Sequence, residues 1–430
     1  MVIEAYKFRL YPTEEQKVLL NKHFGSVRFV YNWALDLCQR KYKTNEKFLG
    51  WMGIVGGGDF IKLKEENPWL YEVNSQSIVN SISHLGRAFD NFFKHRGRFP
   101  KFKSKHDNSQ SFEVPAGLTI DFKHRKIQIP KFLNKKNNDN RIKFILSRKV
   151  PKGKIGTATI SKNPSGEYYI SFIVHVSKEY PEFNKDISKG NSLGIDFGLK
   201  HFLTFSDGRI IDSPEYFKQG KDKLAKEQRK LSKKQKGSRN REKQRVKVAK
   251  AYQHITNQRM NYLHRLTMEL INESQFDVFC LEDLNLKGMS KLWGRKVSDL
   301  SYNSFQTMLQ YKAAKFGKKV IKIGRFDSST QICSHCGHRQ KMPLDRRVYE
   351  CPECGLRMDR DVNAALNIRD FAICRSILKI SNTDGTSGIN AFGDGSSGLD
   401  GESHSGETTV DELGKFPGKV QESCQSSVGK

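Results

Sequence analysis

Long apolar runs are absent from this chain of 430 residues. No stretch reaches the length of about 18 apolar residues that a membrane-spanning helix needs, so we expect neither a transmembrane helix nor a membrane partner. Residues 1–10 contain charged side chains and show neither an apolar core nor a cleavage site, so we expect no secretory signal. We find no internal repeat. These absences favour a protein of the cell interior.

Cysteine is infrequent outside one cluster. Four of the eight cysteines, Cys38, Cys280, Cys374 and Cys424, are scattered singly along the sequence. A disulfide framework needs an oxidising compartment, which nothing in the sequence supports. This usage therefore indicates a reducing compartment, with the other four cysteines available for a metal site.

Acidic residues are in short supply. The chain has 75 Lys+Arg against 46 Asp+Glu, a formal net charge of +29 and a pI near 9.7. Such a charge attracts a polyphosphate partner, because neutralised phosphates release condensed counterions. The alternative is a solvated basic surface, but the excess is clustered: residues 218–250 hold fifteen Lys/Arg against three Asp/Glu. Residues 92–105 interleave basic and aromatic side chains, which would either stack bases or belong to a core.

The first half of the chain changes its hydrophobic period once. Residues 2–10 alternate as a strand does, and Thr13 with Gln16 predicts a capping box that opens a mostly helical stretch. The glycine-rich residues 50–58 interrupt the helical period, so we expect a loop there. Between about 110 and 178 the period becomes two, which predicts a small β-domain.

Turn signals organise the rest of the chain. Pro164–Gly166 predicts a hairpin inside the β-domain, and Asp207-Gly208 predicts a second hairpin further along. A long polar helical region is expected at 214–272. Residues 379–430 are rich in Gly, Ser, Thr and Asn and carry eight acidic against four basic side chains, so we expect a disordered tail.

The clustered cysteines have the spacing of a zinc ribbon. Two C-x2-C pairs are separated by fourteen residues: Cys333, Cys336, Cys351 and Cys354. Gly337 and Gly355 follow the second cysteine of each pair, where the backbone of a tight knuckle must be permissive. Four thiolates close a tetrahedral site, so we expect one structural Zn²⁺ and exposed side chains for His335 and His338. A redox-active pair is disfavoured because the motif occurs twice.

Three acids occupy the positions that a ribonuclease H-like nuclease requires. Asp196 lies on the first strand of a predicted hairpin, Glu282 ends a buried strand, and Asp361 opens an amphipathic helix. Three carboxylates can hold two divalent ions about 3.5–4 Å apart, and Mg²⁺ needs few protein ligands. Singly, each acid could be a cap or turn residue, and residues 194–198 also resemble a phosphate motif of actin-like ATPases. The hypothesis of a magnesium-dependent nuclease rests on all three together.

Taken together, these residues resemble the TnpB family of transposon-encoded nucleases, relatives of the type V CRISPR effectors. The resemblance is carried by Lys7–Gln16, Arg28–Leu35, Pro68–Leu70, Ala88–Phe93, Phe99–Lys105, Gly194–Gly198, Leu281–Leu284, Ser329–Gly337 and Asp359–Ala365. Asp359 and Asp361 are both candidates for the third acid, and we choose Asp361 because it precedes x-Asn-Ala-Ala. Gly56–Gly58 and the tail match no motif of the family.

The resemblance implies an RNA-guided DNA endonuclease. Such a protein binds a guide RNA made from the transposon end and cleaves guide-matched double-stranded DNA beside a short adjacent motif. One RuvC-type centre would use Asp196, Glu282 and Asp361 as catalytic residues that hold two Mg²⁺ ions. We expect a monomer in complex with RNA, in the prokaryotic cytoplasm and at the nucleoid when it acts. The alternatives are an RNA-guided DNA-binding regulator, which three intact acids disfavour, and a transposase that joins ends without RNA.

The predicted fold class is α+β multidomain, and the resemblance to the family implies a division of the chain into five regions. These are a β-barrel-like, wedge-like RNA- and DNA-binding domain (1–12 and 106–186), an inserted helical recognition domain (13–105), a RuvC/ribonuclease H-like α/β nuclease domain (187–326 and 359–378), an inserted zinc ribbon (327–358) and the disordered tail (379–430).

Overall fold

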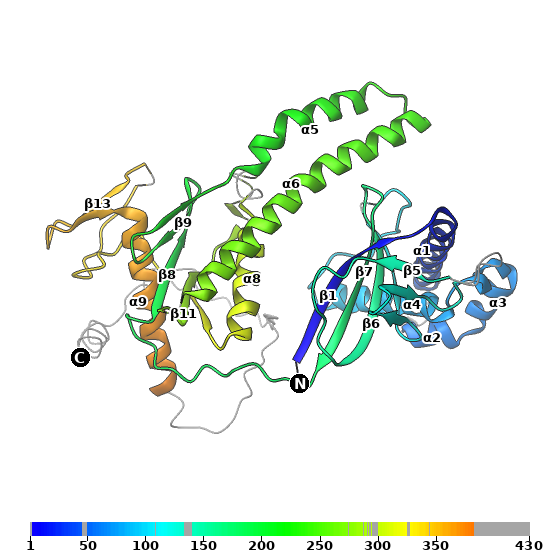
Figure 1. The fold of residues 1–430 in the computed structure, drawn as a ribbon, viewed down its shortest axis with the longest axis horizontal. Coiled ribbons are helices and arrows are strands. Elements are labelled where there is room, and N and C mark those ends of the chain that lie inside the picture. Colours follow the sequence, from blue (N-terminus) through cyan, green and yellow to red (C-terminus); the bar gives the residue numbers. More distant parts are fainter. Residues whose placement is uncertain are drawn as a thin grey trace. The chain divides into compact units, whose positions relative to one another are not determined.

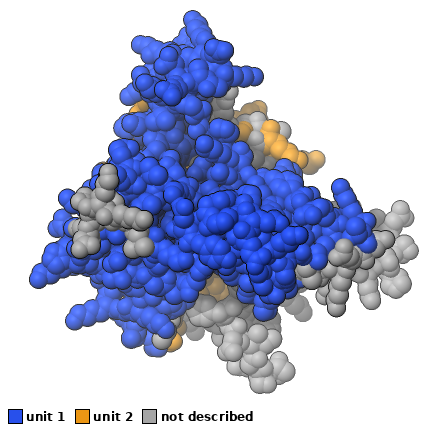
Figure 2. Space-filling view, turned by 90° about the vertical axis from the view of Figure 1, so that its right-hand side faces the viewer, with its two compact units in different colours: residues 1–179, 222–254 blue, residues 180–221, 255–430 orange. Residues whose placement is uncertain are grey.

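The computed structural model divides the chain into two compact units (Figure 1). The first comprises residues 1–179 and 222–254, and the second comprises residues 180–221 and 255–430; Figure 2 colours them separately. The residues that the structure describes are 2–44, 50–107, 109–132, 140–273, 275–286, 288–289, 291, 294, 300–324, 327–343 and 345–381. No helix within these ranges is long and apolar enough to span a membrane.

The first unit is built on a seven-stranded sheet with the order β2-β6-β7-β1-β5-β4-β3. Its strands are β1 (Val2–Tyr11), β2 (Gln110–Val114), β3 (Thr119–Asp121), β4 (Lys126–Gln128), β5 (Ile142–Phe144), β6 (Lys154–Lys162) and β7 (Tyr168–Val176). On β1, Tyr6, Phe8 and Leu10 are buried, as the two-residue period predicts. Within the described residues β2 and β3 are edges, so the expected barrel-like domain contains an open sheet.

Within the described residues, five helical segments lie between β1 and β2 in the sequence, and the first unit also includes residues 222–254, which include parts of two helices described below. The five segments are α1 (Glu14–Lys43), α2 (Trp51–Gly56), α3 (Gly58–Glu66), the 3₁₀-helix η1 (Pro68–Glu72) and α4 (Ser75–Phe93). The predicted capping box of α1 is confirmed: Thr13 N donates to Gln16 Oε1 at 3.0 Å, and Gln16 N donates to Thr13 Oγ1 at 3.3 Å. Further along α1, Leu20 and Phe24 join the core of the sheet.

The prediction of a loop at residues 50–58 is wrong. This stretch forms α2 and the start of α3, with a break at Gly57. The side chain of Ile54 is buried in the helical core, and Trp51 packs against Gly86 of α4. Burial of Ile54 and the contact of Trp51 with α4 outweigh the low helix propensity of glycine, and the local sequence alone does not reveal these contacts.

The second unit contains a mixed five-stranded sheet with the order β10-β9-β8-β11-β12. Its strands are β8 (Ser192–Phe197), β9 (His201–Phe205), β10 (Ile210–Asp212), β11 (Val278–Glu282) and β12 (Lys319–Ile323). The strands β8, β9 and β10 are antiparallel, and the predicted turn at Asp207-Gly208 is confirmed, with φ of 87° at Gly208. β11 is parallel to both β8 and β12.

Along the sequence, the remaining elements lie between the strands of this sheet or after its last strand. They are α5 (Tyr216–Ser232), α6 (Arg239–Asn272), α8 (Tyr302–Lys315), the antiparallel pair β13 (Val348–Glu350) and β14 (Arg357–Asp359), and α9 (Arg360–Ser381). The predicted helical region 214–272 is thus two helices, and Arg241 donates to the carbonyl groups of Leu231 and Lys234 at the turn between them. The expected tail lies outside the described residues from 382 onward.

Helix α9 packs so closely against β8 that the backbones of the helix and the strand are in contact. A Cβ atom built on Gly194 of β8 would lie 1.9 Å from the carbonyl oxygen of Ala365 and 2.9 Å from Cβ of Arg369. Ala365 is itself fully buried. No side chain fits between the strand and the helix here, so glycine on the strand sets how closely α9 approaches.

We predict that Gly194→Ala strongly destabilises the second unit. The added methyl group cannot be accommodated without moving α9, and overpacking of this kind costs about 1–3 kcal/mol or more. Scanning calorimetry of native and variant protein checks the prediction through the thermal midpoint. The matched control is Gly190→Ala in the same unit, where a Cβ would meet only Ser188 Oγ at 3.9 Å. Equal midpoints for the two variants would contradict this packing argument.

Candidate functional site

Asp196 is the buried centre of a group of three acids. It lies on β8, every residue of which is buried. Burial, followed by the negative charges of Glu282 and Asp361, raises the pKa of Asp196 to about 8; the backbone N–H of Phe197 and the charge of Arg360 act in the opposite direction. The charges of both other predicted acids therefore act on Asp196.

Glu282 reaches this group from the adjacent parallel strand. The register between β8 and β11 puts Glu282 at the same level as Asp196, at the carboxyl ends of the two strands. Ser329 donates its hydroxyl hydrogen to Glu282 Oε1 at 3.3 Å. The pKa of Glu282 is raised, chiefly by burial. The hydrogen bond from Ser329 partly offsets this effect, and the negative charges of Asp327 and Asp283 add to it.

The two candidates for the third acid have different hydrogen-bond partners. Asp359 Oδ1 accepts from the backbone N–H groups of Asp361, at 2.8 Å, and Val362, at 3.2 Å, so its carboxylate caps α9. The carboxylate of Asp361 instead accepts from Arg360 Nε and Nη2, at 3.0 and 2.9 Å, and from Arg347 Nη1 at 3.4 Å. This geometry favours Asp361, because its charge is the one that acts on the first acid.

A hydrogen-bond network joins α9 to the loop that carries the first cysteine, and the sequence reasoning missed it. Asn367 Nδ2 donates to the carbonyl oxygens of Ser329 at 2.7 Å and Ile332 at 2.6 Å. Asn363 Nδ2 also donates to Ile332 O, at 2.8 Å, and Asn363 Oδ1 accepts from Ser334 N at 3.0 Å. Two buried asparagines four residues apart on an otherwise apolar helix face are the signal that could have revealed this role.

Tyr302 lies beside the acids and was also missed. Its hydroxyl group donates to the backbone carbonyl of Glu282 at 3.4 Å, and its ring lies 4.1 Å from the ring of Phe197. Burial, then the charges of Glu282 and Asp196, raises the pKa of Tyr302 far above its ordinary value. Tyr302 therefore remains a neutral donor that supports the end of β11.

The four cysteines form a closed cluster of sulfur atoms. The Sγ atoms of four cysteines all lie within 4.8 Å of one another: Cys333, Cys336, Cys351 and Cys354. Two Sγ–Sγ distances are 3.6 and 3.5 Å, near the separation of about 3.8 Å expected for tetrahedral Zn–S bonds of about 2.3 Å. Gly337 and Gly355 have φ of 79° and 70°, as the two predicted knuckles require.

The two groups of ligands suit different metals. Thiolates are soft ligands and prefer zinc, so the cysteine cluster can bind Zn²⁺ and leaves no open position. The side chain of His335 is exposed, as predicted, whereas His338 is partly covered. Carboxylates are hard ligands and suit Mg²⁺ or Mn²⁺. A buried acid repelled by two others is a site that a divalent cation would stabilise.

Known protein families and individual relatives match most of the length of this chain. Three family models match: "Helix-turn-helix domain" at residues 1–47, "Probable transposase" at 171–292 and "Cas12f1-like, TNB domain" at 302–368. A Streptomyces pristinaespiralis protein named "Putative RNA-guided DNA endonuclease" is 34% identical over 371 residues, covering 85% of this chain and 89% of the relative. An Escherichia coli K12 relative of the same description is 29% identical, covering 85% and 91%. A TnpB-like protein of Acanthamoeba polyphaga mimivirus is 24% identical, covering 85% and 72%.

We predict one zinc ion per chain, bound by the cysteine cluster. Cys351→Ser should release the zinc and lower the thermal midpoint, because the metal closes the loop that Asn363 and Asn367 join to α9. Elemental analysis of purified protein checks the stoichiometry. The control Cys374→Ser, which lies outside the cluster, should keep full zinc content. Equal zinc in both variants would contradict the assignment of the ligands.

We predict that Asp196→Asn stabilises the protein without added Mg²⁺, and increasingly so as the pH rises. The unfolded chain releases the Asp196 proton near pH 4, whereas the fold retains it up to a pKa of about 8. Between those values the folded state binds the additional proton, so stability of the native chain falls with rising pH.

Asparagine does not ionise, so the difference in thermal midpoint between Asp196→Asn and the native chain should widen from about pH 5 to pH 8 and then level off. Thermal unfolding at several pH values measures this difference. The control Asp222→Asn changes an exposed acid and should give a small, constant difference. A constant difference for Asp196→Asn as well would contradict the burial argument.

Proposed function

This chain belongs to the TnpB family, and we propose on that premise that it is an RNA-guided DNA endonuclease. Its centre would be of RuvC type, with Asp196, Glu282 and Asp361 as catalytic residues. The observation that carries the proposal is that the charges of Glu282 on β11 and Asp361 on α9 both act on the buried Asp196 of β8, whose pKa is raised to about 8. The strand order β10-β9-β8-β11-β12, antiparallel and then parallel, supports a ribonuclease H-like fold for this unit.

Two Mg²⁺ ions fit the chemistry of this donor set. Asp196 is buried among negative charges, while Arg347 and Arg360 form ion pairs with Asp361. Bound divalent ions would supply an activated water and stabilise the leaving oxygen of a phosphodiester. The three acids would hold the ions, Ser329 and Tyr302 would fix the position of Glu282, and the capped N-terminus of α9 would orient Asp361.

The family supports nucleic-acid partners for the rest of the chain. We propose a guide RNA from the transposon end and double-stranded target DNA beside a short adjacent motif, bound by a monomer in the prokaryotic cytoplasm. The β-rich parts (1–12 and 106–186) and the helical part (13–105) would hold RNA and the motif duplex. The parts 187–326 and 359–378 would form the nuclease domain, with 327–358 as its zinc ribbon. The clustered positive charge of residues 218–250 supports phosphate contacts in addition.

Cleavage of a matched plasmid tests the proposal. The protein is expressed with its flanking transposon DNA, purified with the RNA that it retains, and incubated with Mg²⁺ and a plasmid that carries the guide-matched site beside randomised bases. We expect guide-dependent cutting that reveals the adjacent motif. Asp361→Asn should lower the rate by about a thousandfold or more, because it removes several kcal/mol of stabilisation by the metals.

The matched control is Asp359→Asn, because asparagine also caps a helix and the capping role needs no charge. This variant should cut within a few-fold of the native rate. Guide-dependent binding without any cutting by native protein would favour the RNA-guided regulator, and joining of transposon ends without RNA would favour the transposase. If no RNA is retained and no DNA is bound, the proposed function is wrong.

A further inference from the structure

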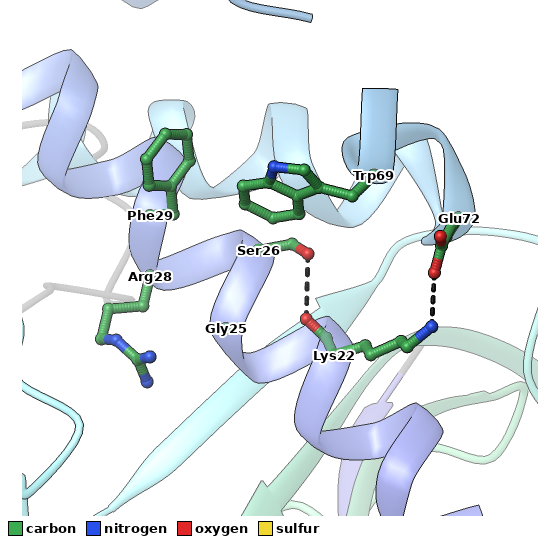
Figure 3. Close-up of a pocket in the computed structure, with 7 residues that line it drawn as sticks. All are labelled: Lys22, Gly25, Ser26, Arg28, Phe29, Trp69 and Glu72. Atoms are coloured by element: carbon green, nitrogen blue, oxygen red, sulfur yellow. Dashed lines mark hydrogen bonds and ion pairs between the residues drawn. The ribbon is translucent and has the colours of Figure 1, made fainter. Parts of the chain in front are cut away.

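A surface hollow in the first unit lies far along the sequence from the acids, between α1 and η1 (Figure 3). Its volume is about 510 Å³, within the range of about 300–1,000 Å³ typical of sites for small ligands. It is lined by Lys22, Gly25, Ser26, Arg28, Phe29, Trp69 and Glu72. The size suits one planar ligand with a polar substituent, and is too small for a duplex.

Two aromatic side chains form one wall of the hollow. Figure 3 shows the rings of Phe29 and Trp69 next to each other, and their centroids lie 5.1 Å apart at an interplanar angle of 62°. Both are exposed, by 36% and 41% respectively. Trp69 Nε1 already donates to Asn67 Oδ1 at 3.2 Å, so the indole is fixed and offers apolar ring surface to a ligand. Exposed aromatic surface of this kind is what unpaired bases stack on.

The cations around the hollow are not equivalent. Lys22 Nζ is paired with Glu72 Oε2 at 2.5 Å. The guanidinium group of Arg28 has no hydrogen-bond or ion-pair partner in the described part of the chain. Figure 3 shows the Arg28 side chain directed away from the rings of Phe29 and Trp69, so a ligand that contacts both needs an aromatic part and a separate anionic part. A nucleotide has both parts, because its base stacks and its phosphate accepts two parallel hydrogen bonds from arginine.

Gly25 keeps the floor of the hollow free of a side chain. It lies inside the 30-residue helix α1, where glycine lowers helix stability relative to alanine. A Cβ atom at Gly25 would meet nothing within 4 Å, so packing within the protein does not require glycine. The missing side chain leaves the floor of the hollow open, as a ligand that approaches the backbone would need.

We propose that this hollow binds one unpaired nucleotide, with its base against Trp69 and Phe29 and its phosphate on Arg28. A base inside a duplex has no free face to offer the aromatic wall, so the nucleotide comes from a single-stranded segment. The proposal is separate from the nuclease centre and rests on the proposed function only for the source of the strand, which is either the guide RNA or an opened DNA strand.

Binding of short oligonucleotides tests the proposal on the full-length protein. The probes are a fluorescein-labelled single-stranded RNA 12-mer, the DNA 12-mer of the same sequence, and its duplex. Fluorescence anisotropy is read at about 0.3 M salt, where screening weakens contacts with phosphates and leaves stacking. Trp69→Ala should weaken single-strand binding by about 5- to 100-fold, and duplex binding by less than twofold.

Two matched pairs separate the hollow from general effects. Gly25→Leu fills the floor and should weaken single-strand binding at least fivefold, whereas Gly25→Ala adds one methyl group, should weaken binding by less than Gly25→Leu does, and should raise the thermal midpoint. Tyr42 lies on the same helix, is 80% exposed and does not line the hollow. Tyr42→Ala removes an aromatic ring there and should leave binding unchanged.

The outcomes also separate this site from the nuclease. Preference for the RNA probe identifies the guide as the source of the nucleotide, and preference for the DNA probe identifies an opened DNA strand; both support the proposal. Asp196→Ala should not alter this binding, so a protein that fails to cut DNA can still bind at the hollow. If Trp69→Ala and Gly25→Leu fold and bind single strands within twofold of the native protein, the proposal is overturned.

Discussion

The contact between α9 and β8 is the constraint on which the candidate site depends. Gly194 lets the helix approach the strand until the backbone of Ala365 touches it, and that approach puts the first turn of α9 beside Asp196. β11 completes the group because its parallel register ends at Glu282. Packing thus holds Asp196 near the like charges of Glu282 and Asp361, and bound cations would relieve this electrostatic repulsion.

The cysteine cluster extends this constraint beyond the sheet. Its first knuckle is joined to α9 by Asn363 and Asn367, and the same loop supplies Ser329 to Glu282. A zinc ion on four thiolates would therefore fix one side of the acidic site without taking part in its chemistry. The sequence places the cysteines between the second and third acids, and the structure gives a physical reason for that order.

Local signals were predictable from the sequence and long-range contacts were not. The capping box at Thr13, the Asp207-Gly208 turn and the two cysteine knuckles depend on neighbouring residues, and all were predicted. The helix α2 depends on burial of Ile54 and on contact between Trp51 and Gly86 of a distant helix, so its glycines were misleading. The three acids could be named because their strand and helix settings are local, whereas Ser329, Tyr302 and Asn367 act through partners far along the chain.

Location of the metals by anomalous diffraction tests the central claim most directly. Crystals of the protein with its RNA, grown with Mn²⁺ in place of Mg²⁺, would be measured at the manganese and zinc absorption edges. The account predicts manganese peaks among Asp196, Glu282 and Asp361, and a zinc peak surrounded by the four cysteines. Manganese at other carboxylates with none at these three acids would contradict it.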